Sequence, residues 1–169
     1  HNCSFCCVWR QFGRRVKFRD PKVVIEYMEY LLKKEGGNSS FFFVDDNFAI
    51  NPDRTAKFLE LLTRLNPLPG WSAQISVDTD PKLFPLMKRA GGKRMLIGAE
   101  SLSTSTLEEY EKKHNVEQKG NTEEKLKRCI LALKEAGLQV HLMWMAGADG
   151  DNPEVIRRNL ELSKEMEVY

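Results

Sequence analysis

Short, densely apolar runs alternate along this chain with longer segments in which apolar residues recur every three or four positions. The most apolar run, 40–44, contains three consecutive phenylalanines, and the runs 71–77, 94–98 and 138–145 are interpreted in the same way. Apolar runs of this length are typical of strands that are covered on both faces. We therefore expect four core strands in these four runs.

The segments between the runs have the period of amphipathic helices. Further helix is expected at 104–113 and at 122–136, with a polar break at 115–121 between them. The apolar positions that define three other helices are Val24, Tyr27, Met28, Leu31 and Leu32, then Phe58, Leu61, Leu62 and Leu65, then Leu83, Leu86, Met87 and Ala90.

Four of the expected helices begin with an Asp or Asn followed by proline. The side-chain oxygen of the first residue accepts a hydrogen bond from a free backbone N–H, and proline needs no donor at the first helical position. Glycines at 36, 91 and 137 follow helical segments, where a left-handed backbone ends the helix. The four pairs are Asp20 with Pro21, Asn51 with Pro52, Asp80 with Pro81 and Asn152 with Pro153.

This regular alternation of helices and strands indicates parallel strands that are joined by right-handed crossover helices. The expected fold class is therefore α/β. Since no linker rich in proline or serine interrupts the chain, residues 1–169 are expected to form one domain. The alternation alone does not distinguish an open, doubly wound sheet from a barrel.

Composition excludes several classes of protein. Of the 169 residues, 41% are hydrophobic, 30% are charged and the formal net charge is +2. Such a chain can bury a core, and it lacks the charge excess that would suggest a nucleic-acid or membrane partner. No apolar run approaches the roughly 20 residues that a membrane helix needs, and no secretory signal is visible.

Three of the four cysteines, Cys3, Cys6 and Cys7, lie within the first seven residues. Clustered thiols fit a metal or redox site in a reducing compartment, so we expect a cytoplasmic protein. Thiolates bind iron–sulfur clusters and zinc, and Cys3 and Cys6 are three residues apart. Their spacing alone leaves an iron–sulfur cluster, a zinc ion and a redox dithiol open. Cys7 is expected to be a partly buried thiol, because adjacent side chains diverge.

The stretch HNCSFC at 1–6 resembles the last part of the radical S-adenosylmethionine (SAM) signature, CxxxCxxC. In that family three cysteines bind three irons of a [4Fe–4S] cluster, and the fourth iron binds SAM. The resemblance implies that Cys3 and Cys6 are the second and third ligands and that Phe5 is the aromatic residue before the last cysteine. The first ligand would lie two residues before His1, so the chain is expected to begin inside the motif, as a piece of a longer protein.

Two acidic residues, Asp45 and Asp46, follow the first apolar run. Parallel α/β folds bind ligands at the carboxyl ends of their strands, whereas a loop that leads into the next helix is the alternative. The stretch VDDNF at 44–48 is similar to the end of the second core strand in radical SAM proteins, above all those with a cobalamin-binding domain. That resemblance implies that Asp45 or Asp46 binds the amino group of SAM.

The stretch IGAES at 97–101 resembles the family's segment after the fourth strand, which lies beside the ribose and methionine of SAM. Gly98 permits a close backbone approach, while Glu100 and Ser101 supply acceptors and a hydroxyl. The alternative is a strand end at which Glu100 faces the N-terminus of the next helix.

Ser72, Gln74 and Ser76 alternate along the second of the four runs, and one face of a barrel strand points into the lumen. Polar residues there indicate a ligand cavity, so Gln74 and Ser76 are candidates for contact with SAM. The segment 136–147 is similar to the family's fifth strand, and its lone histidine, His141, is expected to be a core residue.

A basic stretch follows the cysteines. A solvated face is the default interpretation, and a docking patch for an anionic substrate or an electron donor is the alternative. Family members have a similar segment here, which implies a role in ordering the cysteine loop. The basic residues are Arg10, Arg14, Arg15, Lys17 and Arg19.

The resemblance runs from His1 to about Asn152 and implies part of a (β/α)6 TIM-like barrel whose first and last strands are missing from this chain. The implied function is reductive cleavage of SAM by a [4Fe–4S] cluster, giving a 5′-deoxyadenosyl radical for methylation or rearrangement of a small-molecule substrate. A flavodoxin or ferredoxin is the implied electron donor, and cobalamin, held by a domain outside this chain, is a further implied cofactor. No side chain is assigned a catalytic role, and the piece alone is expected to be inactive.

Two alternatives stay open. A degenerate (β/α) domain would bind SAM or zinc without catalysis, and a first cysteine upstream of this chain would favour the enzyme over it. A tRNA methylthiotransferase-like enzyme usually needs an extra RNA-binding domain, which the sequence does not show.

Overall fold

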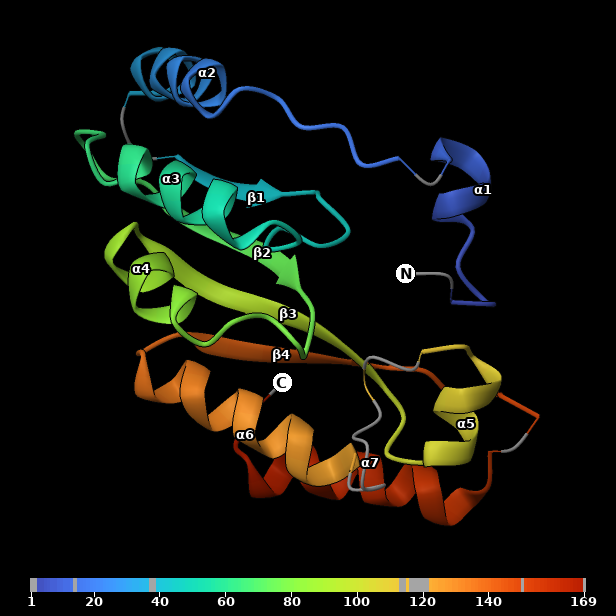
Figure 1. Ribbon diagram of the computed structural model, residues 1–169. Helices are drawn as coiled ribbons and strands as arrows, with labels where there is room; N and C mark the ends of the chain where they lie inside the picture. Colours follow the sequence, from blue (N-terminus) through green and yellow to red (C-terminus); the bar gives the residue numbers. More distant parts are fainter. Residues whose placement is uncertain are drawn as a thin grey trace.

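One parallel sheet, with the strand order β1-β2-β3-β4, forms the centre of the described structure, a computed structural model. Each strand overlaps the apolar run that predicted it, which confirms the expected α/β class. The strands are β1 (Ser40–Phe43), β2 (Gly70–Ile75), β3 (Gly92–Glu100) and β4 (Gln139–Trp144) (Figure 1). The structure describes residues 3–13, 15–36, 39–112, 115, 122–149 and 151–168.

Helices precede and follow the strands as predicted, with two differences. The five-residue α1 directly after the cysteines was not predicted, because so short a segment shows no helical period. The helix expected at 104–113 ends at Glu109, and most of the expected break lies outside the described residues. The helices are α1 (Val8–Phe12), α2 (Pro21–Lys34), α3 (Pro52–Leu62), α4 (Leu83–Arg89), α5 (Thr104–Glu109), α6 (Thr122–Glu135) and α7 (Pro153–Glu165).

Three of the four predicted helix starts have the predicted side-chain hydrogen bond. At the fourth, Asp80 accepts a hydrogen bond from the Lys82 N–H at 3.0 Å, in a turn that precedes the helix. Helix α4 therefore begins at Leu83, later than the proline predicts. The residues that cap their helices as predicted are Asp20, Asn51 and Asn152.

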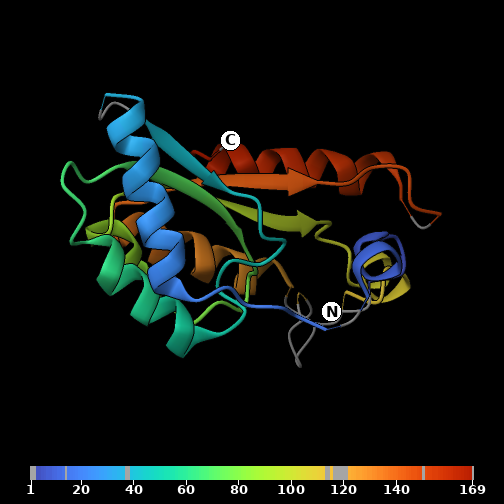
Figure 2. The same cartoon turned by 90° about the horizontal axis from the view of Figure 1, so that it is seen from above.

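The two faces of the sheet have different surroundings. Along β2, Trp71, Ala73 and Ile75 are buried, and Ser72 and Gln74 between them are half-buried. The buried set belongs to the core that the sheet forms with the crossover helices, which lie along one face (Figures 1 and 2). The alternate residues lie on the opposite face, which we call the inner face because it corresponds to the lumen side of a barrel strand.

An aromatic cluster joins β1 and β2 to α3. The ring centroid of Phe43 lies 5.0 to 5.5 Å from those of Phe48, Phe58 and Trp71. The indole N–H of Trp71 donates to the Ala90 carbonyl at 2.8 Å, so the polar atom of this buried ring is paired. Aromatic rings bury large apolar areas, and this cluster fixes the edge of the sheet on which the first helices pack.

Helix α7 is held to α6 by a charged network. Arg158 donates hydrogen bonds at 2.5 Å to Glu123 of α6 and to Glu165 of its own helix. The bond from Arg158 to Glu123 is the main cause that lowers the pKa of Glu123 to about 2. Lys127 adds a second ion pair to Glu123 at 2.7 Å, one turn along α6.

We expect Arg158→Gln to lower the melting temperature by a few degrees at pH 7 and by less in acid. The pKa of Glu123 is depressed in the folded chain, so its interactions stabilise the fold above its ordinary pKa of 4.5, and this stabilisation is lost as the pH falls toward 2. The effect is modest because both groups are partly exposed. Thermal melts at pH 7 and about pH 3 measure it, with exposed Arg157→Gln as the control; a difference that does not shrink in acid would contradict the assignment.

Among the described residues, no helix has the length and apolar character to cross a bilayer.

Candidate functional site at the carboxyl edge of the sheet

The cysteine segment lies at the carboxyl edge of the sheet, near the ends of β3 and β4. Helices α1 and α5 lie at the same edge in both views (Figures 1 and 2). The backbone N–H of Ser4 donates to the Tyr110 carbonyl at 3.0 Å, which ties the cysteine segment to the residue after α5. Parallel α/β folds bind their ligands at this edge. The cysteine segment and the strand ends beside it therefore form the candidate site.

A turn brings the two predicted metal ligands together. The N–H of Cys6 donates to the Cys3 carbonyl at 3.1 Å, and the indole N–H of Trp9 donates to the same carbonyl at 3.4 Å. Cys3 is buried, with 7% of its surface exposed, and Cys6 is half-buried. Cys7 is exposed and precedes α1, so the expectation that it is partly buried was wrong.

Burial raises the pKa of the Cys3 thiol, and the positive charge of Lys112 acts in the opposite direction. A thiol that binds a metal ion does so as the thiolate, so ligation at Cys3 would release its proton. Cys129 differs: it lies in α6 among core residues, and burial raises its pKa to about 12. Cys129 is therefore a structural thiol.

Glu100 ends β3 in an unusual backbone conformation. Its φ of 63° is left-handed, which is strained for a residue other than glycine and is frequent at functional sites. Its carboxylate forms an ion pair with Lys112, and the two side chains are only 11% and 10% exposed. A Cβ at Gly98 would lie 2.6 Å from Glu100 Oε1 and 2.7 Å from Lys112 Nζ. A larger side chain at position 98 would therefore collide with this ion pair.

The segment after α5 holds the end of β3 in place. The side-chain amide of Asn115 donates to the carbonyls of Gly98 and Ala99 at 2.9 and 3.1 Å. Sequence reasoning missed Tyr110, Lys112 and Asn115, because a polar segment after a short helix has no periodic signal. It considered the N-terminus of the next helix as a partner for Glu100, and the structure supplies Lys112 instead.

Ser101 is buried, with 1% of its surface exposed, and its hydroxyl oxygen accepts a hydrogen bond from the Ser103 N–H at 3.1 Å. Ser103 in turn caps α5 by accepting from the Thr106 N–H at 3.3 Å. The backbone N–H of Met145 donates to the Glu100 carbonyl at 2.9 Å. Strand β3 is thus joined both to β4 and to the turn into α5.

Five buried side-chain oxygens near this edge have no hydrogen-bond partner among the described residues: Asn47 Oδ1, Ser76 Oγ, Thr79 Oγ1, Thr106 Oγ1 and Asn115 Oδ1. Asn47 lies in the turn after β1, Ser76 directly follows β2, and Asn115 contacts the end of β3. Because buried polar atoms are almost always paired, these oxygens fit an edge that a bound ligand completes.

Asp45 and Asp46 are exposed in the segment that follows β1. The Phe48 N–H donates to the Gln74 carbonyl at 2.9 Å, which ties this segment to β2. Within the described part of the chain, no group of three or more His, Cys, Asp or Glu side chains could hold a metal ion. The structure therefore brings Cys3 and Cys6 together, without adding either aspartate to them.

His141 lies on the inner face of the sheet. It is half-buried and pairs in register with Leu96, so it is not the core residue that was expected. It alternates along β4 with Val140 and Leu142, which take the core positions. The basic side chains follow the default interpretation of a solvated face, except that Arg14 lies outside the described residues; those exposed are Arg10, Arg15, Lys17 and Arg19.

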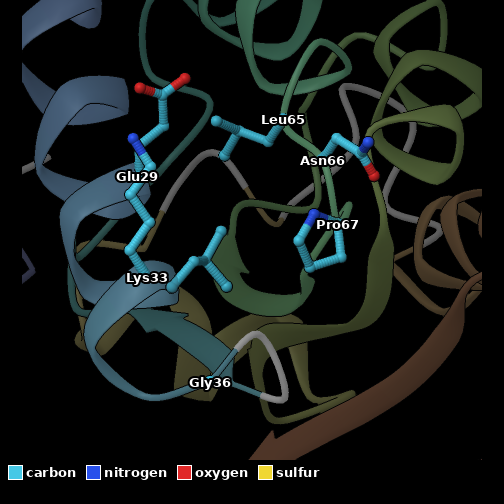
Figure 3. Close-up of a pocket in the computed structure, with 7 residues that line it drawn as sticks. Glu29, Lys33, Gly36, Leu65, Asn66 and Pro67 are labelled. Atoms are coloured by element: carbon cyan, nitrogen blue, oxygen red, sulfur yellow. The ribbon is translucent and has the colours of Figure 1, made fainter.

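A pocket elsewhere is separate from this site. Figure 3 shows Glu29 and Lys33 of α2 facing Leu65, Asn66 and Pro67, which follow α3. These residues lie near the amino-terminal edge of the sheet, at the end away from the cysteines (Figure 1). The pocket therefore carries none of the predicted site residues.

The fold and this edge define a parallel α/β domain of the kind that binds a cofactor at its strand ends. A family model described as the radical SAM superfamily matches residues 1–162. The chain belongs to the radical SAM superfamily, a family of enzymes whose cofactors are SAM and a [4Fe–4S] cluster, and the predicted family is confirmed.

Two curated relatives are similar over almost the whole chain. The anaerobic magnesium-protoporphyrin IX monomethyl ester cyclase of Rubrivivax gelatinosus is 27% identical over 166 residues, which is 96% of this chain and 28% of that protein. The bacteriochlorophyllide d C-8(2)-methyltransferase of Chlorobaculum tepidum is 29% identical over 174 residues, 99% of this chain and 38% of that protein. The chain thus spans well under half the length of either relative.

The radical SAM methyltransferase TsrM from Kitasatospora setae has a similar structure. With tryptophan and a SAM analogue bound, it has a TM-score of 0.73 at 20% identity, over 92% of this chain and 29% of that one. A second TsrM structure, with cobalamin and a [4Fe–4S] cluster bound, has a TM-score of 0.72 at 20% identity, over 92% of this chain and 28% of that one. At these identities the likeness shows the fold, and the predicted TIM-like class is confirmed. The two further strands of a complete barrel stay a prediction.

Proposed function

We propose that this chain is the core of a radical SAM enzyme in which Cys3 and Cys6 hold two irons of the [4Fe–4S] cluster. The observation that carries the proposal is the place of the cysteine turn, which contacts Tyr110 at the ligand-binding edge of a parallel sheet. Thiolates are the ligands of iron–sulfur clusters, and this turn would supply two of the three that the radical SAM signature uses. A third cysteine, from outside these residues, completes the ligands.

SAM would occupy the space between the cysteine turn and the strand ends. Asp45 or Asp46 complements its amino group, and Glu100 can accept hydrogen bonds from its ribose. The unpaired oxygens of Asn47 and Ser76 support a ligand there. The proposed SAM-contacting residues are Phe5, Asp45, Asp46, Gln74, Ser76, Gly98, Glu100 and Ser101.

When bound, SAM and the reduced cluster would supply one-electron chemistry, the reductive cleavage of SAM to methionine and a radical able to abstract hydrogen. The protein's own residues bind, orient and shield. On the inner face, Leu96 lies in register between Gln74 and His141, and Met143 follows His141 by two residues on the same face. These apolar side chains would limit access of water. The proposed electron donor is a flavodoxin or ferredoxin. The proposed location is the cytoplasm, and the clustered thiols support it because thiols persist in reducing compartments.

The substrate that we propose is a small molecule, and the reaction is its methylation or rearrangement. Support comes from the relatives, which are named as a methyltransferase and a cyclase. Cobalamin, bound by a domain outside this chain, is a further proposed cofactor, because a similar structure contains cobalamin together with the cluster.

Anaerobic iron–sulfur reconstitution of the full-length protein tests the function. We expect about four irons per chain, a broad visible absorbance, and 5′-deoxyadenosine after addition of SAM and dithionite. A protein that binds iron but produces no 5′-deoxyadenosine would refute the enzyme and leave the cluster. A protein that binds neither iron nor SAM would refute the whole proposal.

A further inference from the structure

We propose that the residues at the end of α5, Glu109–Lys112, form a dock that fixes the cysteine turn before any cofactor binds, with Tyr110 as the positioning residue. The docking stands on contacts within the chain. Only the use of this fixed turn to bind a cluster rests on the proposed function.

The first contact joins the backbone of the dock to Ser4. The Ser4 N–H donates to the Tyr110 carbonyl at 3.0 Å, and the Ser4 hydroxyl donates to the Glu109 carbonyl at 3.1 Å. The last carbonyls of a helix lack partners within the helix. Ser4, more than 100 residues away in sequence, donates hydrogen bonds to two of them. The cysteine turn thus supplies donors that the end of α5 lacks.

The second contact is between aromatic rings. Phe5 and Tyr110 meet edge to face, with centroids 5.0 Å apart and planes at 68°, an arrangement that aromatic pairs favour. Tyr110 is only 8% exposed, whereas Phe5 is 39% exposed. Tyr110 therefore belongs to the fixed part of the domain, and Phe5 is the side chain that docks onto it.

The dock is anchored to β3. Lys112 pairs with Glu100, and its Nζ lies 5.9 Å from the Phe5 ring centroid, within range of a cation–π contact. The Lys112 N–H donates to the Leu107 carbonyl at 2.8 Å, which folds the segment back onto α5. Because Glu100 ends β3, one continuous set of contacts leads from the sheet through the dock to the cysteine turn.

Within the described residues, the cysteine turn is joined to the sheet through this dock, and the Trp9 indole of the adjacent α1 donates to the Cys3 carbonyl. Cys3 is its one core residue, and the Ser4, Phe5 and Cys7 around it are exposed. Elements with few buried contacts open locally at low free energy. Without the Tyr110 ring, the turn keeps its internal hydrogen bond and the Ser4 bonds to two backbone carbonyls, but it loses the aromatic contact that packs Phe5 against the dock.

Amide hydrogen exchange of the full-length protein, without metal and under anaerobic conditions, measures the docking directly. In Tyr110→Ala, we expect exchange of the peptide that contains Ser4 and Cys6 to be about tenfold faster than in the wild type, the worth of one aromatic contact. Tyr110→Phe keeps the ring that faces Phe5 and is expected to restore wild-type protection. Peptides from β2 and β3 report whether the fold is intact in each variant.

Equal exchange of this peptide in the wild type, Tyr110→Ala and Tyr110→Phe would overturn the proposal. If Tyr110→Ala also loses protection in β2 and β3, Ser4→Ala replaces it, because Ser4 is exposed and its substitution removes only the hydroxyl bond to Glu109. That variant is then expected to exchange faster in this peptide alone, and unchanged exchange would refute the dock. Iron binding is measured separately, so a docked turn that binds no iron refutes the proposed function and leaves the dock.

Discussion

Replacing Cys3 and Cys6 together with serine is expected to reduce the iron content of the reconstituted full-length protein from about four irons per chain to less than about one. Serine keeps the size of the side chain but removes the thiolate that iron requires. The turn itself is expected to persist, because the bond between the Cys6 N–H and the Cys3 carbonyl uses only backbone atoms. Iron analysis and visible absorbance after anaerobic reconstitution measure the result.

Cys7→Ser is the matched control for this experiment. Cys7 is adjacent to Cys6 but is exposed and precedes α1, so its substitution is expected to leave the iron content unchanged. Loss of iron in Cys7→Ser, together with retention in Cys6→Ser, would transfer the ligand role to Cys7. Iron retained in the double variant would remove the cysteine turn from the site altogether.

Glu100→Gln is expected to destabilise the fold by about 3 kcal/mol, because removing one member of a buried ion pair leaves the other charge without compensation. The pair is buried on both sides, with side chains 10% and 11% exposed. Glutamine keeps the shape of the residue at its strained φ, so the loss reports the charge. The melting temperature of the metal-free protein measures it, and a loss of this size corresponds to several degrees.

The double variant Glu100→Gln with Lys112→Met separates structure from function. Removing both charges is expected to recover most of the lost stability, since a buried pair is often replaced without penalty. SAM binding, measured by calorimetry on the reconstituted protein, is expected to stay weakened in the double variant if Glu100 contacts SAM. Full recovery of both stability and SAM affinity would assign Glu100 a structural role alone.

The order of helices and strands was set by the sequence, because each signal is local. Apolar runs, the spacing of apolar residues and the caps at Asp20, Asn51 and Asn152 depend on neighbours a few residues away. The cysteine motif is also a local feature of the sequence. Cys3 and Cys6 are close in space because they are close in sequence, and one turn joins them.

Partners from distant parts of the chain could be found only in the tertiary structure. Ser4 and Tyr110 lie more than 100 residues apart, and Glu100 faces Lys112 only because the segment after α5 folds back. No period in the sequence encodes such contacts, since they depend on where crossover helices deliver the chain. The sequence thus determined which residues are candidates for the chemistry. The contacts of the segment after α5 with the end of β3 and with the cysteine turn decided where the cysteines lie.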